Sequence, residues 1–230
     1  MDSVPDESFD LSAVPLFPLP NVVLFPRAIL PLHIFEERYK AMTADALHGD
    51  GQVAMALLKP GWEKNYYQQP PIEPVVCAGR ILSHERLADG TYNFLLEGVV
   101  RARIVREFEG KQYRVAELEA LRETVVMEVD LDEQRRRLAA MFDETPLGRK
   151  GWATWGGAIA DQFRRIIRGP LPTAQIADLV AFNFLEDVAL RQKLLAETDM
   201  RRRVEQTVDA LASALATMEP AGREPEPGLN

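Results

Sequence analysis

The sequence predicts an α+β fold, with a β-rich part up to about residue 124 and a helical part from residue 130 to 218. The chain has 230 residues, 47% of them hydrophobic and 27% charged, which is enough apolar surface for a core and excludes wholesale disorder. Its 16 prolines and 14 glycines predict many breaks between short elements. Near residue 130 the apolar spacing changes from a strand-like period of two to a helical period.

The first apolar stretch, Val14 to Phe35, predicts short strands and extended crossings because five prolines interrupt it. Proline has no backbone N–H to offer to a helix or to a central strand. The next stretch, EERYKAMTADALHGDG, has apolar residues at near-helical spacing and glycines at its end, and it predicts a helix. Residues 52–59, QVAMALLK, predict a buried strand.

Two longer strands are expected after a proline-rich loop at residues 60–74. Residues 75–87 and 91–108 flank Asp89-Gly90, a pair that favours a hairpin turn. Gly98 interrupts the second strand and predicts a bulge or a sharp bend there. Residues 113–121 alternate again between apolar and polar, which predicts a further strand.

The helical part carries its own start and stop signals. Gly169-Pro170 can end one helix, Pro172-Thr173 can begin the next, and Asp199 can cap the last. The apolar spacing places these helices at about 131–142, 152–168, 173–180, 187–197 and 199–218.

Charge and cysteine usage limit the function classes. The formal net charge is −8, which opposes a nucleic-acid or anionic-membrane binder because both ligands need a positive field. Cys77 is the only cysteine, so an internal disulfide and a zinc site of several cysteines are excluded. Residues 1–12 and 219–230 read as a flexible and a disordered tail. Neither a secretory signal nor a membrane-spanning run is apparent, so we expect a cytoplasmic location.

A family resemblance is carried by four segments in order. LFPLPNVVLFPRAILPLHIFEERYKAM (16–42) resembles the opening signature of the Lon protease amino-terminal domain family. AGRI (78–81), NFLLEGVVRARI (93–104) and ADLVAFNFLEDVALRQKLLAETDMRRRV (177–204) resemble later parts of it. The resemblance covers roughly residues 14–215 and departs at Arg27, where the family usually has Gly. It implies a PUA-like β pseudo-barrel followed by an α-helical bundle, in the free-standing form without ATPase and peptidase domains.

The resemblance also implies a function. In full Lon proteases this domain helps to recognise substrate polypeptides and supports assembly. The chain's only Gly-Lys pair, Gly110-Lys111, lacks the neighbours of a phosphate-binding loop, and no segment resembles the Lon peptidase. The sequence therefore predicts a non-catalytic module that binds exposed apolar segments of client polypeptides or a specific protein partner, with no cofactor and with homo-oligomerisation left open.

Residues that could carry catalysis or metal binding are scattered. His33, His48, His84 and Cys77 show no close ligand spacing, and structural roles are favoured for them. Glu36 and Glu37 are neighbours at a helix start, where they point about 100° apart and suit the helix dipole better than acid–base catalysis. We predict no catalytic, cofactor-binding or metal-binding residue.

Candidate contacts to a polypeptide lie in the loop and on one strand. Trp62, Tyr66 and Tyr67 are large, rather rigid side chains of the kind found at binding hot spots, although they could equally cover the sheet. Arg101 and Arg103 share a strand face and could bind an acidic peptide, although a solvated or ion-paired face is the commoner outcome. For Trp152, Trp155 and the Arg201–Arg203 run, core packing and a solvated face are favoured.

Two other function classes stay open at this point. A small-ligand protein or enzyme would use a pocket between the two halves, and a polar cluster in such a cleft would reveal it. An RNA binder is conceivable because PUA-like folds often serve RNA, and a basic face would reveal it.

Overall fold

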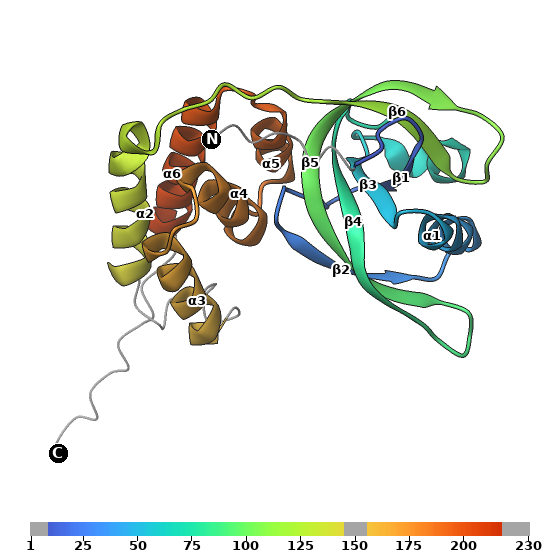
Figure 1. Ribbon diagram of the computed structural model, residues 1–230, viewed down its shortest axis with the longest axis horizontal. Helices are drawn as coiled ribbons and strands as arrows, with labels where there is room; N and C mark the ends of the chain where they lie inside the picture. The colour runs from blue at the N-terminus through green and yellow to red at the C-terminus, as the bar shows by residue number, and fades with distance from the viewer. Residues whose placement is uncertain (1–8, 145–155, 218–230) are drawn as a thin grey trace, which may run out of the picture.

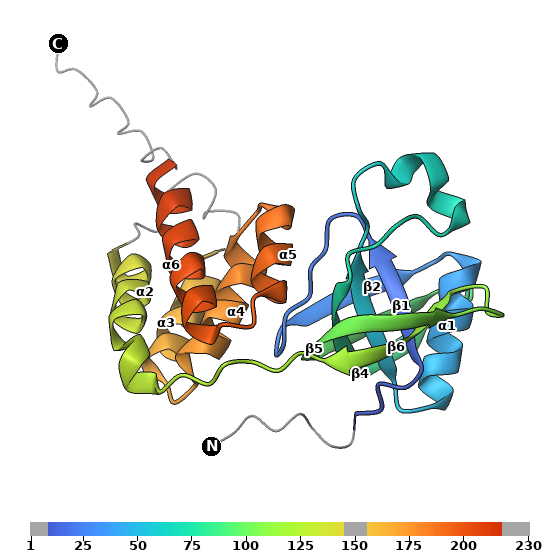
Figure 2. The same ribbon diagram turned by 90° about the horizontal axis from the view of Figure 1, so that it is seen from above.

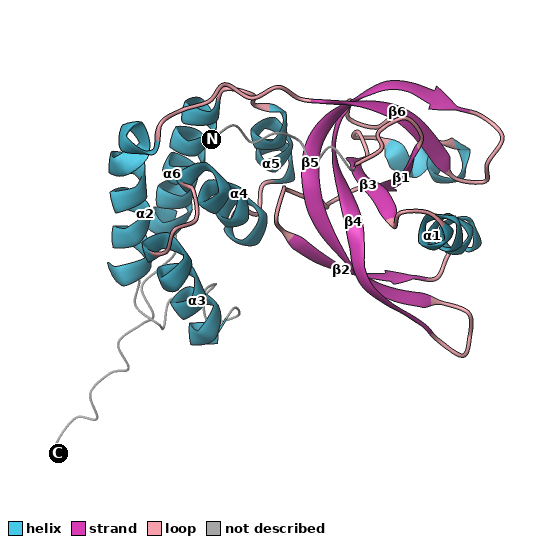
Figure 3. Ribbon diagram, viewed as in Figure 1, coloured by secondary structure: helices cyan, strands magenta, loops and turns pink. Residues whose placement is uncertain are grey.

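The computed structural model describes residues 9–144 and 156–217, and Figure 1 shows them as two lobes side by side. The strand lobe contains β1 (Val14–Leu19), β2 (Ile29–Ile34), α1 (Glu37–His48), β3 (Gln52–Leu57), the 3-10 helix η1 (Trp62–Gln68), β4 (Val75–Arg86), β5 (Tyr92–Phe108) and β6 (Arg114–Ala120). The helical lobe contains η2 (Glu128–Leu131), α2 (Asp132–Glu144), α3 (Gly156–Arg168), α4 (Thr173–Phe184), α5 (Val188–Ala196) and α6 (Met200–Thr217). The predicted α+β fold is confirmed, and Figure 3 shows all the strands in one lobe together with α1, while α2 to α6 form the other lobe.

The six strands form one sheet that closes on itself. Their order is β2-β5-β4-β3-β1-β6, and β5 also pairs with β6. The 17-residue β5 makes this closure possible, because its first half pairs with β2 and its last residues pair with β6. Only β1 and β3 run parallel among these pairs. The result is a small barrel of β1, β3, β4, β5 and β6, with β2 as an additional strand along β5.

The barrel interior is narrow because its lining side chains are small. Five of the nine buried residues of this inner cluster are alanines. Strand β3 shows the consequence, since Ala54 and Ala56 face the interior while Val53, Met55 and Leu57 belong to the outer core. Both faces of β3 are therefore buried, which explains its unbroken apolar sequence.

The outer core packs between the barrel and α1 and continues into the helical lobe. Tyr39, Met42 and Ala46 are buried on one face of α1, as their spacing predicts, and Gly49 is its C-cap. Residues 9–12, grouped by composition with the N-terminal tail, lie against the barrel instead. Phe9 and Leu11 pack on the inner cluster, and Leu118 donates its N–H to the carbonyl of Leu11 at 2.8 Å.

Gly98 is the site of the predicted bulge in β5. Gly79 pairs with Gly98 and Ala78 with Val100, so Val99 is the extra residue of the bulge. The loop after β1 lies directly on this point, because Arg27 donates its N–H to the carbonyl of Gly98 at 2.7 Å. A Cβ on Gly98 would stand less than 3.0 Å from the carbonyl of Phe25. Only glycine fits here.

The hairpin between β4 and β5 also forms as predicted. Gly90 adopts a positive φ of 82°, a conformation that glycine takes without strain. Asp89 accepts hydrogen bonds from the N–H of Thr91 at 3.0 Å and from its hydroxyl at 2.7 Å. Beyond this turn β5 pairs with β4 along one edge and with β2 along its other edge, so the three strands form one extended surface.

The helices begin and end close to the predicted signals. α3 ends at Arg168 before Gly169-Pro170, and α4 begins at Thr173. Asp187 accepts from the N–H of Leu190 at 3.0 Å, and Asp199 caps α6 by accepting from Arg202 N–H at 3.1 Å. The predicted break at 145–151, together with Trp152, Trp155 and residues 219–230, lies outside the described residues.

A buried charged cluster joins the two lobes. Arg101 of β5 and Arg203 of α6 both contact Oδ1 of Asp178 on α4, the Arg203 contact at 3.2 Å. Glu123, in the connection between the lobes, is ion-paired with both arginines. Helix α5 adds a neutral link, because Gln192 donates to the carbonyl of Val75 at 2.8 Å. The cluster carries two positive and two negative charges, so it is balanced.

Candidate functional site

The predicted aromatic loop forms η1, which Figure 2 shows projecting from the strand lobe away from the helices. Trp62 and Tyr66 pack edge to face with ring centroids 5.5 Å apart, and both are partly exposed. Tyr66 donates its hydroxyl to Glu36 at 2.5 Å, which ties η1 to the start of α1. The side chain of Tyr67 lies outside the described part of the structure. The loop is therefore an anchored surface on which the rings of Trp62 and Tyr66 are partly exposed.

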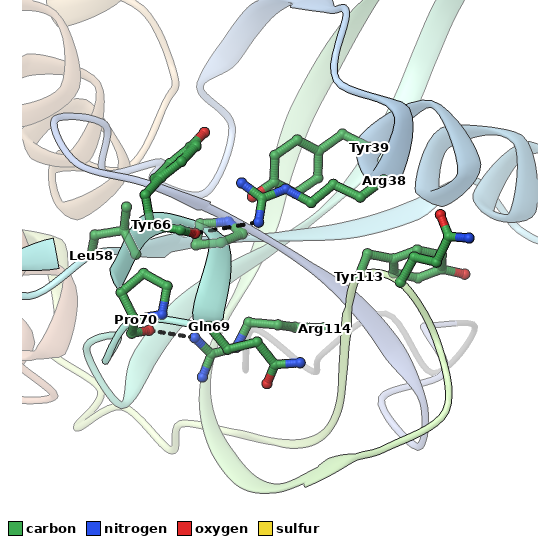
Figure 4. A pocket seen from close by; sticks show the side chains of 10 residues that line it. Arg38, Tyr39, Leu58, Tyr66, Gln69, Pro70, Tyr113 and Arg114 are labelled. Carbon is green, nitrogen blue, oxygen red and sulfur yellow. Dashed lines mark hydrogen bonds between the residues drawn. The ribbon is translucent and has the colours of Figure 1, made fainter. Parts of the chain in front are cut away.

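Arg38 of α1 contacts side chains of both α1 and η1. Its guanidinium lies over the rings of Tyr39 and Tyr66, 4.6 and 4.8 Å from their centroids, and it pairs with Glu36 at 2.9 Å. Figure 4 shows the recess that these side chains share with Leu58, Tyr113 and Arg114. Its volume is about 20 Å³, which suits a water molecule and not a ligand.

The two arginines predicted to share a binding face have different surroundings. Arg101 is only 3% exposed and is ion-paired beneath the helical lobe, so it does not face a partner. Burial lowers the pKa of Arg101, but the carboxylates of Asp178 and Glu123 outweigh that effect and raise it. Arg103, two residues further along β5, is exposed. The helical lobe covers Arg101 but not Arg103, which explains why only Arg101 is buried.

The most apolar exposed surface lies on β2 and its neighbours. Pro31 is paired directly opposite Leu95, and Ile29 follows on the same face because strand side chains alternate. Leu82 stands at a register shift in β4 beside this pair. Phe35, which follows β2, is 65% exposed, and its ring stacks on His33 with centroids 6.1 Å apart. We call this surface the sheet-face patch: Ile29, Pro31, Phe35, Leu82 and Leu95.

The patch borders the free edge of β2. Among the described residues, β2 pairs with β5 alone. Gly98 donates to the carbonyl of Ala28 at 2.9 Å, so the alternation of antiparallel pairing turns the backbone of Ile29, Pro31 and His33 toward the free edge. Pro31 has no N–H to donate there, and a proline on an edge strand weakens the addition of another strand. The patch therefore offers apolar contact more than strand pairing.

An open groove lies between the lobes next to the patch. It has a volume of about 620 Å³ and is lined by Arg27, Gln162, Arg165, Ile166, Gly169, Pro170, Leu171, Pro172 and Gln175. Arg27 comes from the loop before β2, and the other lining residues come from α3, α4 and the turn between them. Arg27 lies two residues before Ile29, so this segment of the chain connects the groove with the sheet-face patch. We call this groove the interlobe groove.

The titratable groups considered for catalysis do not converge. Cys77 is fully buried, and burial raises the pKa of its thiol to about 12, so it is protonated at neutral pH. His33 is hydrogen-bonded through Nδ1 to Asn93 at 2.7 Å, and His84 is exposed on β4. Within residues 9–144 and 156–217, no three His, Cys, Asp or Glu side chains are grouped as metal ligands would be. In the same residues, no helix is long and apolar enough to cross a membrane.

Sequence reasoning missed the sheet-face patch and the interlobe groove. In residues 29–35 apolar side chains occupy both strand faces, which is typical of burial on both sides. Only the fold shows that one of these faces, which carries Ile29 and Pro31 of β2 and Leu95 of β5, is left exposed. The sequence signal for the groove was the departure at Arg27, where the family usually has Gly, and the structure shows a positive φ of 65° at that residue.

Comparison with known proteins identifies the family. Residues 13–213 match the ATP-dependent protease La (LON) substrate-binding domain, and the chain belongs to this family. Similar proteins include the Lon protease of Dictyoglomus thermophilum, 23% identical over 214 residues, and that of Trichlorobacter lovleyi, 28% identical over 224 residues. These matches cover 91% and 94% of this chain but 25% and 26% of the relatives, so the chain spans about a quarter of their length.

Solved structures show the same fold. The N-terminal domain of a Mycobacterium avium complex Lon protease has a TM-score of 0.67 at 17% identity, over 87% of this chain and 98% of that one. A Lon N-terminal domain protein from Xanthomonas campestris has a TM-score of 0.59 at 22% identity, over 86% and 98% of the two chains. The resemblance predicted from the sequence is confirmed.

Proposed function

We propose that this chain is a non-catalytic module that binds exposed apolar segments of client polypeptides, and that the sheet-face patch is its main contact. The family supports a role in substrate recognition. The main observation for this location is that Ile29, Phe35, Leu82 and Leu95 are between 39% and 65% exposed. They lie on the surface formed by β2, β5 and β4. Exposed apolar side chains that gather on one surface in this way are typical of interaction sites.

Burial of apolar surface would supply the affinity. Each aliphatic or aromatic side chain that becomes buried contributes on the order of 1.5–3 kcal/mol before association costs are subtracted. The strands hold the patch in place, so little order is gained on binding. Trp62, Tyr66, Tyr67 and Arg103 remain proposed secondary contacts for longer clients. A cytoplasmic location is also part of the proposal, since a chain with a single cysteine does not depend on an internal disulfide.

A titration tests the proposal. Fluorescently labelled lactalbumin, reduced and blocked with neutral iodoacetamide, serves as a permanently unfolded client, and native lactalbumin serves as its folded counterpart. We expect binding of the unfolded form only. The variant Ile29→Ser/Phe35→Ser/Leu95→Ser should weaken it by about tenfold or more, because three apolar contacts are lost. The variants Trp62→Ala and Arg103→Gln measure the secondary contacts in the same titration.

Three exposed apolar residues between β6 and α2 provide the matched control variant. Val125, Met127 and Val129 are 64–70% exposed and lie outside the patch. Their triple serine variant removes comparable apolar surface and should leave the affinity within about twofold of wild type. Equal losses in both triple variants, or no binding by the wild type, would contradict the proposal. Light scattering on the same samples measures self-association.

The alternative of a small-ligand protein or an enzyme rests on the interlobe groove, whose volume lies within the range of ligand sites. The described residues that line it include no carboxylate, histidine or cysteine, so they supply no general base or nucleophile. The groove is also open to solvent along its length. These properties favour a polypeptide over a small molecule.

A further inference from the structure

We propose that the interlobe groove selects client segments in which apolar side chains stand next to carboxylates. The inference rests on the proposed polypeptide binding and adds the chemistry of the preferred segment. Its basis is the pair of arginines, Arg27 and Arg165, that line an otherwise neutral and largely apolar groove.

The other arginines of α3 show what distinguishes Arg165. Arg164 is ion-paired with Asp161, and Arg168 is ion-paired with Asp143 at 2.8 Å. Arg165, between them, makes no ion pair or side-chain hydrogen bond with any described residue and lines the groove. Within residues 9–144 and 156–217 its positive charge is uncompensated, on a chain whose net charge is −8.

Arg27 places a second uncompensated charge on the opposite lobe. Its backbone is fixed by the hydrogen bond to Gly98 and by a φ of 65°, a conformation that glycine adopts more easily. The side chain is exposed at the groove and has no ion-pair partner among the described residues. The two lobes thus each present one guanidinium to the same groove.

The surface between the arginines is suited to apolar contact. Ile166, Leu171, Pro170 and Pro172 line it, and no described acidic side chain does. A segment with a leucine or phenylalanine between two glutamates would place the apolar group on this surface and its carboxylates near the guanidinium groups. The same segment could continue past Arg27 onto Ile29 and the sheet-face patch.

Two short fluorescent peptides test this inference. Both peptides carry the same apolar residues and continue into a stretch long enough to reach the sheet-face patch. They differ only at the flanking positions, which are glutamates in one peptide and glutamines in the other. Wild-type protein should bind both, and the glutamate peptide should bind more tightly by about fivefold to tenfold at low salt, as expected for two exposed ion pairs. Raising the salt concentration should reduce this preference.

The variant Arg27→Gln/Arg165→Gln should abolish the preference and leave the affinity for the glutamine peptide within about twofold. Glutamine keeps a side chain at residue 27, so the backbone strain is unchanged. The control Arg122→Gln/Lys193→Gln removes the same charge at exposed positions outside the groove and should retain the preference.

The outcomes separate the two proposals. Equal binding of both peptides by the wild type, or a preference that persists in Arg27→Gln/Arg165→Gln, overturns the groove assignment and leaves polypeptide binding standing. Failure of both peptides to bind overturns both proposals. Loss of the preference in the control variant as well would assign it to net charge, which also overturns the groove assignment.

Discussion

Gly98 shows how one residue fixes the relation between several segments. It lies at the bulge of β5, and the loop that carries Phe25 and Arg27 packs on its α-carbon. That loop leads into β2 and presents Arg27 to the interlobe groove. The shape of the candidate binding surface therefore depends on the absence of a side chain at this position.

The variant Gly98→Ala should lower the free energy of unfolding by about 3 kcal/mol, because the new methyl group would overlap the carbonyl of Phe25. Urea denaturation followed by circular dichroism measures the change. Gly49→Ala is the control, since a Cβ there would meet its nearest atom at 3.7 Å, an ordinary contact. A loss below about 1 kcal/mol at Gly98 would show that the bulge tolerates a side chain.

Cys77 should report unfolding of the strand lobe. The native thiol should resist iodoacetamide, while the unfolded chain reacts fully, because the side chain is inaccessible and its pKa is raised by burial to about 12. Mass spectrometry of the alkylated protein measures this. Rapid labelling under native conditions would mean that β4 opens without global unfolding.

The raised pKa of Cys77 also predicts a dependence of stability on pH. The folded state holds the thiol protonated, so this contribution is complete below the ordinary pKa of 9.0 and is lost as the pH rises toward 12. From pH 8 to pH 10, the thiol should account for a loss of about 1 kcal/mol in unfolding free energy. Cys77→Ala should reduce that slope, because the titrating thiol is removed. An unchanged slope would contradict the prediction.

At the scale of elements, the buried charged cluster determines how strands and helices are joined. Asp178 of α4 is contacted by arginines from β5 and α6, so a single carboxylate links three elements. The cost of taking these groups out of water is offset only while every charge keeps its partner. The cluster is therefore sensitive to any single replacement.

The variant Asp178→Ala should cost about 3–5 kcal/mol, because it leaves buried arginines without their shared carboxylate. Asp143→Ala, which removes a surface pair with Arg168, should cost less than about 1 kcal/mol. Thermal and urea unfolding of both variants measure the difference. The double variant Arg101→Met/Asp178→Leu should recover part of the loss, and equal costs for Asp178 and Asp143 would contradict a structural role for the cluster.

At the scale of the whole molecule, the two lobes create the candidate binding surface together. The strand lobe contributes the sheet-face patch and Arg27, and the helical lobe contributes the remaining wall of the groove. Because the charged cluster joins the lobes behind this surface, weakening it should also disturb client binding. The site is thus a property of the assembled chain and not of either lobe.

The sequence alone determined the order of the elements and most of their ends. Asp89-Gly90 formed the hairpin, and Asp187 and Asp199 capped their helices. The prolines were a weaker guide, because Pro20 follows the end of β1 but Pro15, Pro18 and Pro31 lie inside β1 and β2. These signals act within a few residues through backbone conformation and local hydrogen bonds, so they can be read without the fold. The family resemblance extended this reading to the β pseudo-barrel.

Tertiary structure decided what is buried and what is exposed. Arg101 and Arg103 are alike in sequence, but only Arg101 meets a carboxylate, which lies 77 residues away in the chain. Ile29 and Phe35 resemble core residues, but they are 49% and 65% exposed because no described element covers their face of the sheet. Pairing and burial depend on partners that are distant in sequence, and no local pattern records which partner a side chain will meet.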